Sequence, residues 1–178
     1  MKPYLSIEKE VYSRDKSSED PEFGTEQYFE IVINVENRAD FQKAVTVTDD
    51  LPESFIPNDL ENTEWAVAIG PGETQTIVYF ASPTEPGDFS FVPATVLWND
   101  GGETYSLVSN EIDGNFHVSG SKVVLTKELS SSYMLVGEEI TVTIRVSNDG
   151  DKDIEASFQE KIPEELSLVS GVSTWNGN

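Results

Sequence analysis

Cysteine is absent from the 178 residues of this chain, and histidine occurs once, as His117. Without a thiol there can be no disulfide, no cysteine nucleophile and no thiolate-bound zinc or iron–sulfur centre. A Ser-His-Asp triad would have to use His117, which lies beside a short linker-like segment and is better explained as a half-buried junction residue. We therefore expect no enzyme activity, no catalytic residue and no bound organic cofactor.

Basic residues are also scarce, because 11 Lys and Arg stand against 33 Asp and Glu, giving a formal net charge of −22. So few cations cannot follow a phosphate backbone, and nucleic acid is not expected as a partner. The same charge would be repelled by an anionic membrane surface. No apolar run approaches the roughly 20 residues that a membrane-spanning helix needs.

Alternation of apolar and polar residues with a period of two dominates what is present, and it predicts β-strands. The clearest runs place apolar side chains at every second position from Phe29 to Val35 and from Ile140 to Val146. Further strands are predicted for segments 4–11, 43–48, 65–69, 74–80, 88–98, 104–108 and 123–129. The fold class that follows is all-β.

Turn-forming residues separate these runs, notably at 70–72, 83–87 and 99–102. Asn, Asp and Gly adopt the positive φ angles that tight turns need, and we expect Gly150 to supply such an angle. Pro93 lies inside one predicted strand, which marks that strand as an edge or as bulged.

The chain also contains an internal repeat, in which the second copy aligns with the first when Asn148 is placed on Asn37. In this repeat alignment Pro163 falls on Pro52 without a gap. Each copy has an alternating strand, an Asn-containing turn, a second alternating strand and a Leu-Pro or Ile-Pro pair. Apolar positions coincide at Phe29/Ile140, Ile31/Val142, Ile33/Ile144, Val47/Phe158, Leu51/Ile162 and Phe55/Leu166.

The second copy is shorter than the first. The first continues for about 50 residues after Trp65, whereas the sequence ends shortly after Trp175. We expect a complete β-sandwich in residues 1–118, a linker at 119–121 and the first half of a second sandwich in 122–178. An isolated half-sandwich exposes strand edges, so self-association through such an edge is expected.

The motifs of both copies resemble the immunoglobulin-like (Ig-like) repeat of archaeal and bacterial cell-surface proteins, which is related to the bacterial cell-adhesion-related domain. The residues that carry this resemblance are Gly137–Ile144, Asn148–Gly150 and Ile162–Pro163, together with the Pro-Gly pairs at 71–72 and 86–87. The first copy departs from the family pattern at Arg38–Ala39 and in a polar insertion at 13–26. The resemblance implies a tandem Ig-like sandwich on a cell envelope, often near an S-layer, with no catalytic residues.

One acidic cluster has the spacing of a calcium-binding loop. Asp149, Asp151, Asp153 and Glu160 fit loop positions 1, 3, 5 and 12. However, Ile154 stands where that loop needs glycine, and the turn of the first copy lacks the Asp cluster. The competing interpretation is a solvated acidic turn, and calcium is the one candidate ion.

Aromatic residues could form a ligand-stacking face, although their place in the strand patterns favours packing in the core or at strand edges. Trp98, next to the turn at 99–102, is the candidate for exposure to a ligand.

The function expected from these features is that of a non-catalytic spacer or adhesion module at the cell surface. Its partners would be other repeats of the same chain and a component of the envelope. A carbohydrate- or peptide-binding sandwich is the main alternative, and an intracellular scaffold is a third.

Overall fold

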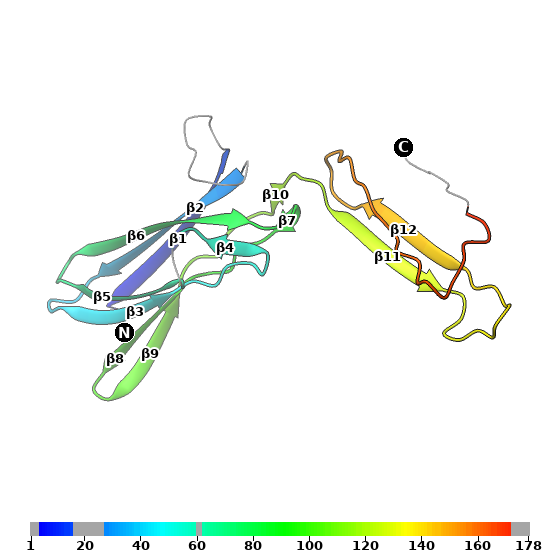
Figure 1. Cartoon of the computed structure of the whole chain (residues 1–178). Coiled ribbons are helices and arrows are strands. Elements are labelled where there is room, and N and C mark those ends of the chain that lie inside the picture. Colours follow the sequence, from blue (N-terminus) through cyan, green and yellow to red (C-terminus); the bar gives the residue numbers. More distant parts are fainter. Residues whose placement is uncertain (1–3, 16–26, 60–61, 172–178) are drawn as a thin grey trace.

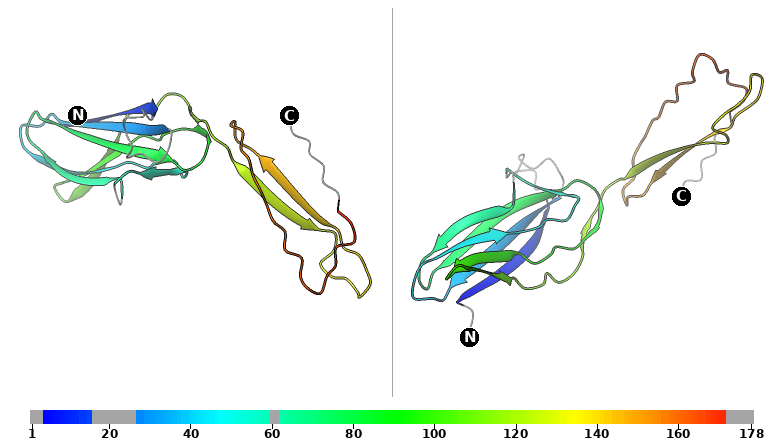
Figure 2. Two further views of the ribbon diagram at one scale, coloured as in Figure 1. Left: turned by 45° about the horizontal axis from the view of Figure 1, so that its top comes forward. Right: turned by 90° about the horizontal axis from the view of Figure 1, so that it is seen from below.

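The computed structural model describes residues 4–15, 27–59 and 62–171. These residues carry twelve β-strands and no helix, which confirms the all-β class. The strands form two parts that lie end to end: a larger unit with β1 to β10 and a smaller unit with the hairpin β11–β12 (Figure 1). Figure 2 shows from two further directions that the segment after β10 connects the parts.

Two four-stranded antiparallel sheets make up most of the first unit. One sheet has the order β1-β2-β6-β4, with bounds Leu5–Asp15, Gln27–Asn37, Thr74–Pro83 and Phe55–Pro57. The other has the order β5-β3-β8-β9, with bounds Glu64–Ile69, Lys43–Thr48, Thr95–Asp100 and Glu103–Val108. A short pair joins β7 (Gly87–Phe89) to β10 (Phe116–Val118) at the end nearest the second unit.

The core lies between the two sheets. Central strand β2 contributes four apolar side chains that are completely buried, because every second residue points inward. The opposite sheet covers them with apolar residues of β3 and β8, so the arrangement is sandwich-like. The buried apolar residues of the strands are Leu5, Phe29, Ile31, Ile33, Val35, Val45, Val47, Phe55, Ile69, Ile77, Tyr79, Ala81, Val96 and Val118.

The strand predicted over 88–98 is wrong as a single element. It is divided into β7 and β8, and Pro93 lies in the extended connection between them. Proline cannot donate a ladder hydrogen bond, and at this point the chain passes from the small β7–β10 pair to the sheet containing β3. Strands 43–48 and 123–129 are confirmed with the predicted bounds.

The second unit consists of β11 (Val123–Leu129) and β12 (Val142–Asn148), followed by residues 149–171 without a strand. The alternating segment after Asp153 therefore forms no strand, although its equivalent in the first unit is β3. In the first unit β3 pairs with both β5 and β8. No equivalent of those strands occurs among the described residues of the second unit, so this segment has no ladder to join.

A charged pair lies inside the core of the first unit. Lys9 Nζ is 2.5 Å from Asp49 Oδ1, and both side chains are fully buried. Tyr79 Oη donates a hydrogen bond to Asp49 Oδ2 at 2.6 Å, and Lys9 Nζ donates to the carbonyl oxygen of Val92 at 2.7 Å. Burial lowers the pKa of Lys9 and raises the pKa of Asp49, while the attraction between the two charges opposes both shifts.

This buried pair gives a prediction with an internal control. Replacing Lys9 by Met leaves the Asp49 carboxylate buried without its cation, and we expect the variant to lose about 3–5 kcal/mol of unfolding free energy. The corresponding pair of the second unit, Lys127 Nζ–Glu160 Oε1 at 2.6 Å, is exposed. The Lys127→Met variant should therefore cost less than about 1 kcal/mol. Amide hydrogen exchange in β1–β2 and in β11–β12 measures each unit separately, and equal losses in the two units would contradict the expectation.

Candidate functional site at the junction

The connection between the units is held by hydrogen bonds to one carboxylate, that of Asp151. Its Oδ1 accepts from the backbone N–H of Gly120 at 2.7 Å, and its Oδ2 accepts from Ser119 Oγ at 2.9 Å. His117 Nε2 lies 2.9 Å from the same Oδ2. Asp151 belongs to the turn after β12, so a residue of the second unit binds the linker and the residue that precedes it.

His117 extends this contact into the first unit. Its Nδ1 is 2.8 Å from Asp88 Oδ1, and Asp88 lies opposite His117 in the β7–β10 pair. Both ring nitrogens thus face a carboxylate, an arrangement that the doubly protonated imidazolium satisfies by donating from both. The histidine side chain is exposed, which corrects the expectation of a half-buried junction residue only in its degree of burial.

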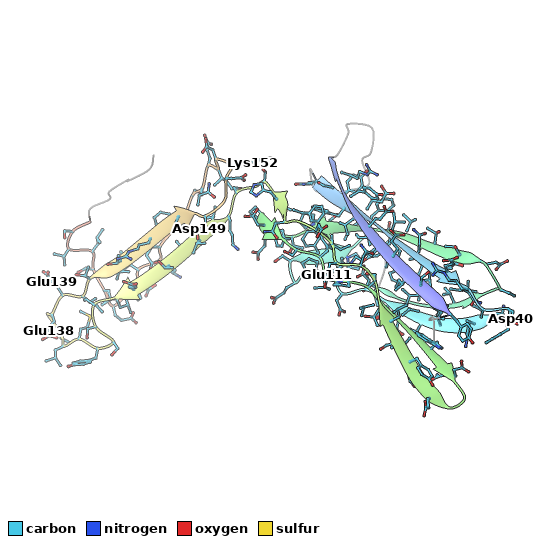
Figure 3. The ribbon with its side chains drawn as sticks, turned by 180° about the vertical axis from the view of Figure 1, so that it is seen from behind. Asp40, Glu111, Glu138, Glu139, Asp149 and Lys152 are labelled. Carbon is cyan, nitrogen blue, oxygen red and sulfur yellow. The ribbon has the colours of Figure 1, made fainter. Side chains whose placement is uncertain are left out.

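Backbone contacts and a second ion pair fix the same joint. The carbonyl oxygen of Gly120 accepts from the N–H groups of Asp151 and Lys152, at 2.9 and 3.1 Å. Lys122 Nζ lies 2.6 Å from Glu85 Oε2 of the first unit. Figure 3 shows Asp149 and Lys152 at the end of the second unit that faces the first, with Glu138 and Glu139 at the opposite end.

Gly150 is required here for space and not for its backbone angle. The prediction of a positive φ at Gly150 is wrong, because it is not among the positive-φ glycines of the chain. A Cβ atom at this position would instead lie 2.2 Å from the Gly120 oxygen and 2.7 Å from the Lys122 nitrogen. Both neighbours are backbone atoms that cannot move aside cheaply, so the linker approaches this turn as closely as only glycine permits.

The same contacts shift the pKa values of His117 and Asp151. Hydrogen bonds to Asp151 and then to Asp88 raise the pKa of His117 above its usual 6.5. Hydrogen bonds from His117, from the Gly120 N–H and from Ser119 hold the pKa of the Asp151 carboxyl well below its usual range. The arrangement favours an imidazolium–carboxylate contact between the two units.

The four acidic residues predicted to bind calcium make different contacts in the structure. Asp151 binds the linker, and Glu160 pairs with Lys127 of β11. Within the described ranges no three His, Asp or Glu side chains gather into a group that could hold a metal ion. Asp149 and Asp153 remain exposed on the turn, and calcium binding at this loop stays a prediction.

The predicted ligand residue Trp98 lies on β8 and is half-buried against the core. Its ring stacks on that of Tyr105 from β9, with centroids 5.7 Å apart and planes inclined by 20°. Trp65 is also half-buried and packs against Tyr79. Trp175 lies outside the described residues.

The position of His117 near the linker is evident from the sequence, but its partners are not. Asp88 is 29 residues away, and the ion pair between Lys122 and Glu85 spans 37 residues. No spacing pattern links such positions, because they meet only when the β7–β10 pair and the start of the second unit come together at the joint.

No family model and no curated protein matches this chain. Among solved structures, it is similar to a GH20 exo-β-N-acetylglucosaminidase from Vibrio harveyi in complex with N-acetylglucosamine, with 8% identity, 71% of this chain and 24% of that chain covered, and a TM-score of 0.35. It is also similar to an inactive mutant of the GH20 exo-β-N-acetylglucosaminidase from Vibrio harveyi, with 9% identity, 71% of this chain and 20% of that chain covered, and a TM-score of 0.35. This chain spans about a quarter or less of their length, and likeness at this level carries no functional argument.

The junction predicts a pH dependence. His117, whose folded pKa is raised, stabilises the joint fully below pH 6.5 and loses that effect as pH rises through the raised value. Asp151, whose folded pKa is lowered, contributes fully above pH 3.8 and loses that effect as pH falls through the lowered value. The joint is therefore most stable between about pH 4 and 6.5.

An NMR titration of the His117 ring tests this expectation. The ring should titrate above its usual pKa in the intact chain, and Asp151→Asn should move that pKa part of the way back, because Asp88 remains. The Asp153→Asn variant changes a carboxylate of the same turn that makes no contact with His117, and it should leave the titration unchanged. A His117 pKa in the intact chain no higher than that in the Asp151→Asn variant would show that the joint is open in solution.

Proposed function

We propose that this chain is a non-catalytic structural module, a stretch of spacer or stalk in a larger cell-surface protein that is built from tandem Ig-like β-sandwich repeats. The observation that carries the proposal is the junction. Hydrogen-bonding contacts converge on Asp151 and on the Gly120 carbonyl, and they hold the second unit against the first. A spacer needs such a joint, because freely jointed units would not project a binding site over a distance.

The repeat organisation is supported by local geometry that recurs at positions equivalent in the repeat alignment. Asn37 Nδ2 donates to the carbonyl of Phe41 at 2.8 Å, and Asn148 Nδ2 donates to that of Lys152 at 2.8 Å. In both turns the Asn Oδ1 accepts the N–H of the residue two positions later. The N–H of Phe55 bonds to the Pro52 carbonyl, as that of Leu166 does to Pro163.

Strand pairing supports the same equivalence. Ile7 lies opposite Val35 in β1–β2, and Leu125 lies opposite Val146 in β11–β12. Lys9 and Lys127, each two residues further on, reach a carboxylate at the same place in the two copies, Asp49 and Glu160. These matching contacts favour two copies of one unit over a chance likeness in sequence pattern.

No helix in the described part of the chain is long and apolar enough to cross a membrane. The charge of the chain suits the surface role that we propose. A net charge of −22 keeps neighbouring acidic stalks apart by repulsion and keeps them solvated. Other repeats of the same chain and a component of the envelope are the partners that this role implies.

The proposal is tested by measuring whether the two units share one orientation. Residual dipolar couplings from β1–β6 and from β11–β12 should fit a single alignment tensor in the intact chain. Gly150→Ala should destroy that agreement, because the added Cβ collides with the linker backbone. The matched control is Gly171→Ala, since a Cβ at Gly171 meets no atom within 4 Å. Independent tensors for the unmodified chain would overturn the role as a fixed spacer.

A second candidate function is carbohydrate binding, and the stacked pair of Trp98 and Tyr105 favours it. Tyr105 is exposed, so the pair presents part of an aromatic surface on the β8–β9 hairpin. If this surface binds sugars, oligosaccharide should quench or shift the tryptophan fluorescence saturably, and Tyr105→Ala should weaken binding by about tenfold. The Tyr12→Ala variant removes an exposed tyrosine from β1 instead and should have no effect. Absence of any saturable change across a panel of glycans would exclude carbohydrate binding at this surface and leave the spacer role as the proposed function.

A further inference from the structure

Positions that are buried in the first unit are exposed at the equivalent place in the second. Ile31 and Val47 are 0% exposed, whereas their equivalents Val142 and Phe158 are 42% and 60% exposed. Phe55 is 6% exposed and its equivalent Leu166 is 42% exposed. The residue types are apolar in both units, so the difference arises from what covers them.

Strand β6 provides part of that cover in the first unit. It pairs with the edge of β2 that lies away from β1, which we call the outer edge, and its Ile77, Tyr79 and Ala81 side chains point into the core. In the second unit β12 takes the place of β2, and only β11 pairs with it among the described residues. Among the described residues the outer edge of β12 therefore has no strand partner, and it lies beside an apolar face on which Val142 is exposed and Ile144 and Val146 are half-buried.

We propose that the outer edge of β12 is a strand-binding site, which takes an extended polypeptide segment of the β6 type in antiparallel pairing. Such a segment has apolar side chains at alternate positions and a tyrosine among them. Main-chain hydrogen bonds to β12 supply affinity, and the inward side chains supply specificity. The occupant is a strand of this kind that completes the second unit. The inference rests on the equivalence of the two units and not on the proposed role as a spacer.

The register of the first unit defines the expected complex. Tyr79 lies opposite Ile31 and Ile77 lies opposite Ile33. Carried over by the repeat alignment, a β6-type segment places its tyrosine opposite Val142 and its isoleucine opposite Ile144. The tyrosine hydroxyl would then reach Glu160 as Tyr79 reaches Asp49. Glu160 already pairs with Lys127, and the Glu160 carboxylate would accept this hydrogen bond.

Charge disfavours a second copy of the chain as the occupant. Each copy carries a formal charge of −22, and bringing two such molecules edge to edge costs electrostatic free energy. A β6-type segment has no such cost, since residues 74–83 contain no Asp, Glu, Lys or Arg.

A labelled peptide with the sequence of residues 74–83 tests the site against the full chain. We expect saturable binding at one peptide per chain, measured by fluorescence anisotropy. Amide exchange of β12 should slow on binding, while that of β2 should not change because its edge is already paired. Replacing Ile77 by Asp in the peptide should weaken binding more than about tenfold, since that side chain enters the apolar face.

The matched control peptide carries Val78→Asp, because Val78 points to the exposed side of β6. It should bind as the parent peptide does. Since both changes are made in the peptide, no result can be attributed to unfolding of the chain. Equal binding by the two altered peptides, or no protection of β12, would overturn the proposal. A chain that dimerises through β12 without peptide would overturn the named occupant in favour of a second copy.

Discussion

Burial of one face of β2 organises the core of the first unit. The inward residues of this strand from Phe29 to Val35 are fully buried, and removing that apolar surface from water is the main favourable term in folding. Strands β1 and β6 extend the sheet on either side, and the sheet with β3 and β8 closes the face. Even the buried Lys9–Asp49 pair is tolerated only because Tyr79 and the Val92 carbonyl complete its hydrogen bonds.

The second unit shows the same local structure, but among its described residues it has neither a counterpart of β6 nor a second sheet. Its hairpin has the register of β1–β2, its Asn turn has the same hydrogen bonds, and Lys127 meets Glu160 as Lys9 meets Asp49. Short-range contacts are thus preserved where the long-range ones are lacking. The segment that the repeat alignment places on β3 forms no strand, because a β-strand depends on neighbours that lie far away in sequence.

The junction depends on a different kind of interaction, the convergence of polar groups on one carboxylate. Asp40, the residue equivalent to Asp151, is exposed at the end of the first unit that lies away from the joint (Figure 3). The same turn position therefore serves as a joint in one unit and as free surface in the other. This difference follows from the linker, which reaches only one of the two turns.

Sequence pattern alone determined the all-β class and most of the strands, because alternation and turn chemistry are local. It failed at Pro93, where the strand breaks, and at Gly150, where space and not φ requires glycine. Only the tertiary structure decided that Asp151 binds His117 and the linker, that Trp98 stacks on Tyr105, and that the apolar face of β12 is partly exposed. These facts depend on which distant segments meet, and a period of two along one strand carries no information about its neighbours.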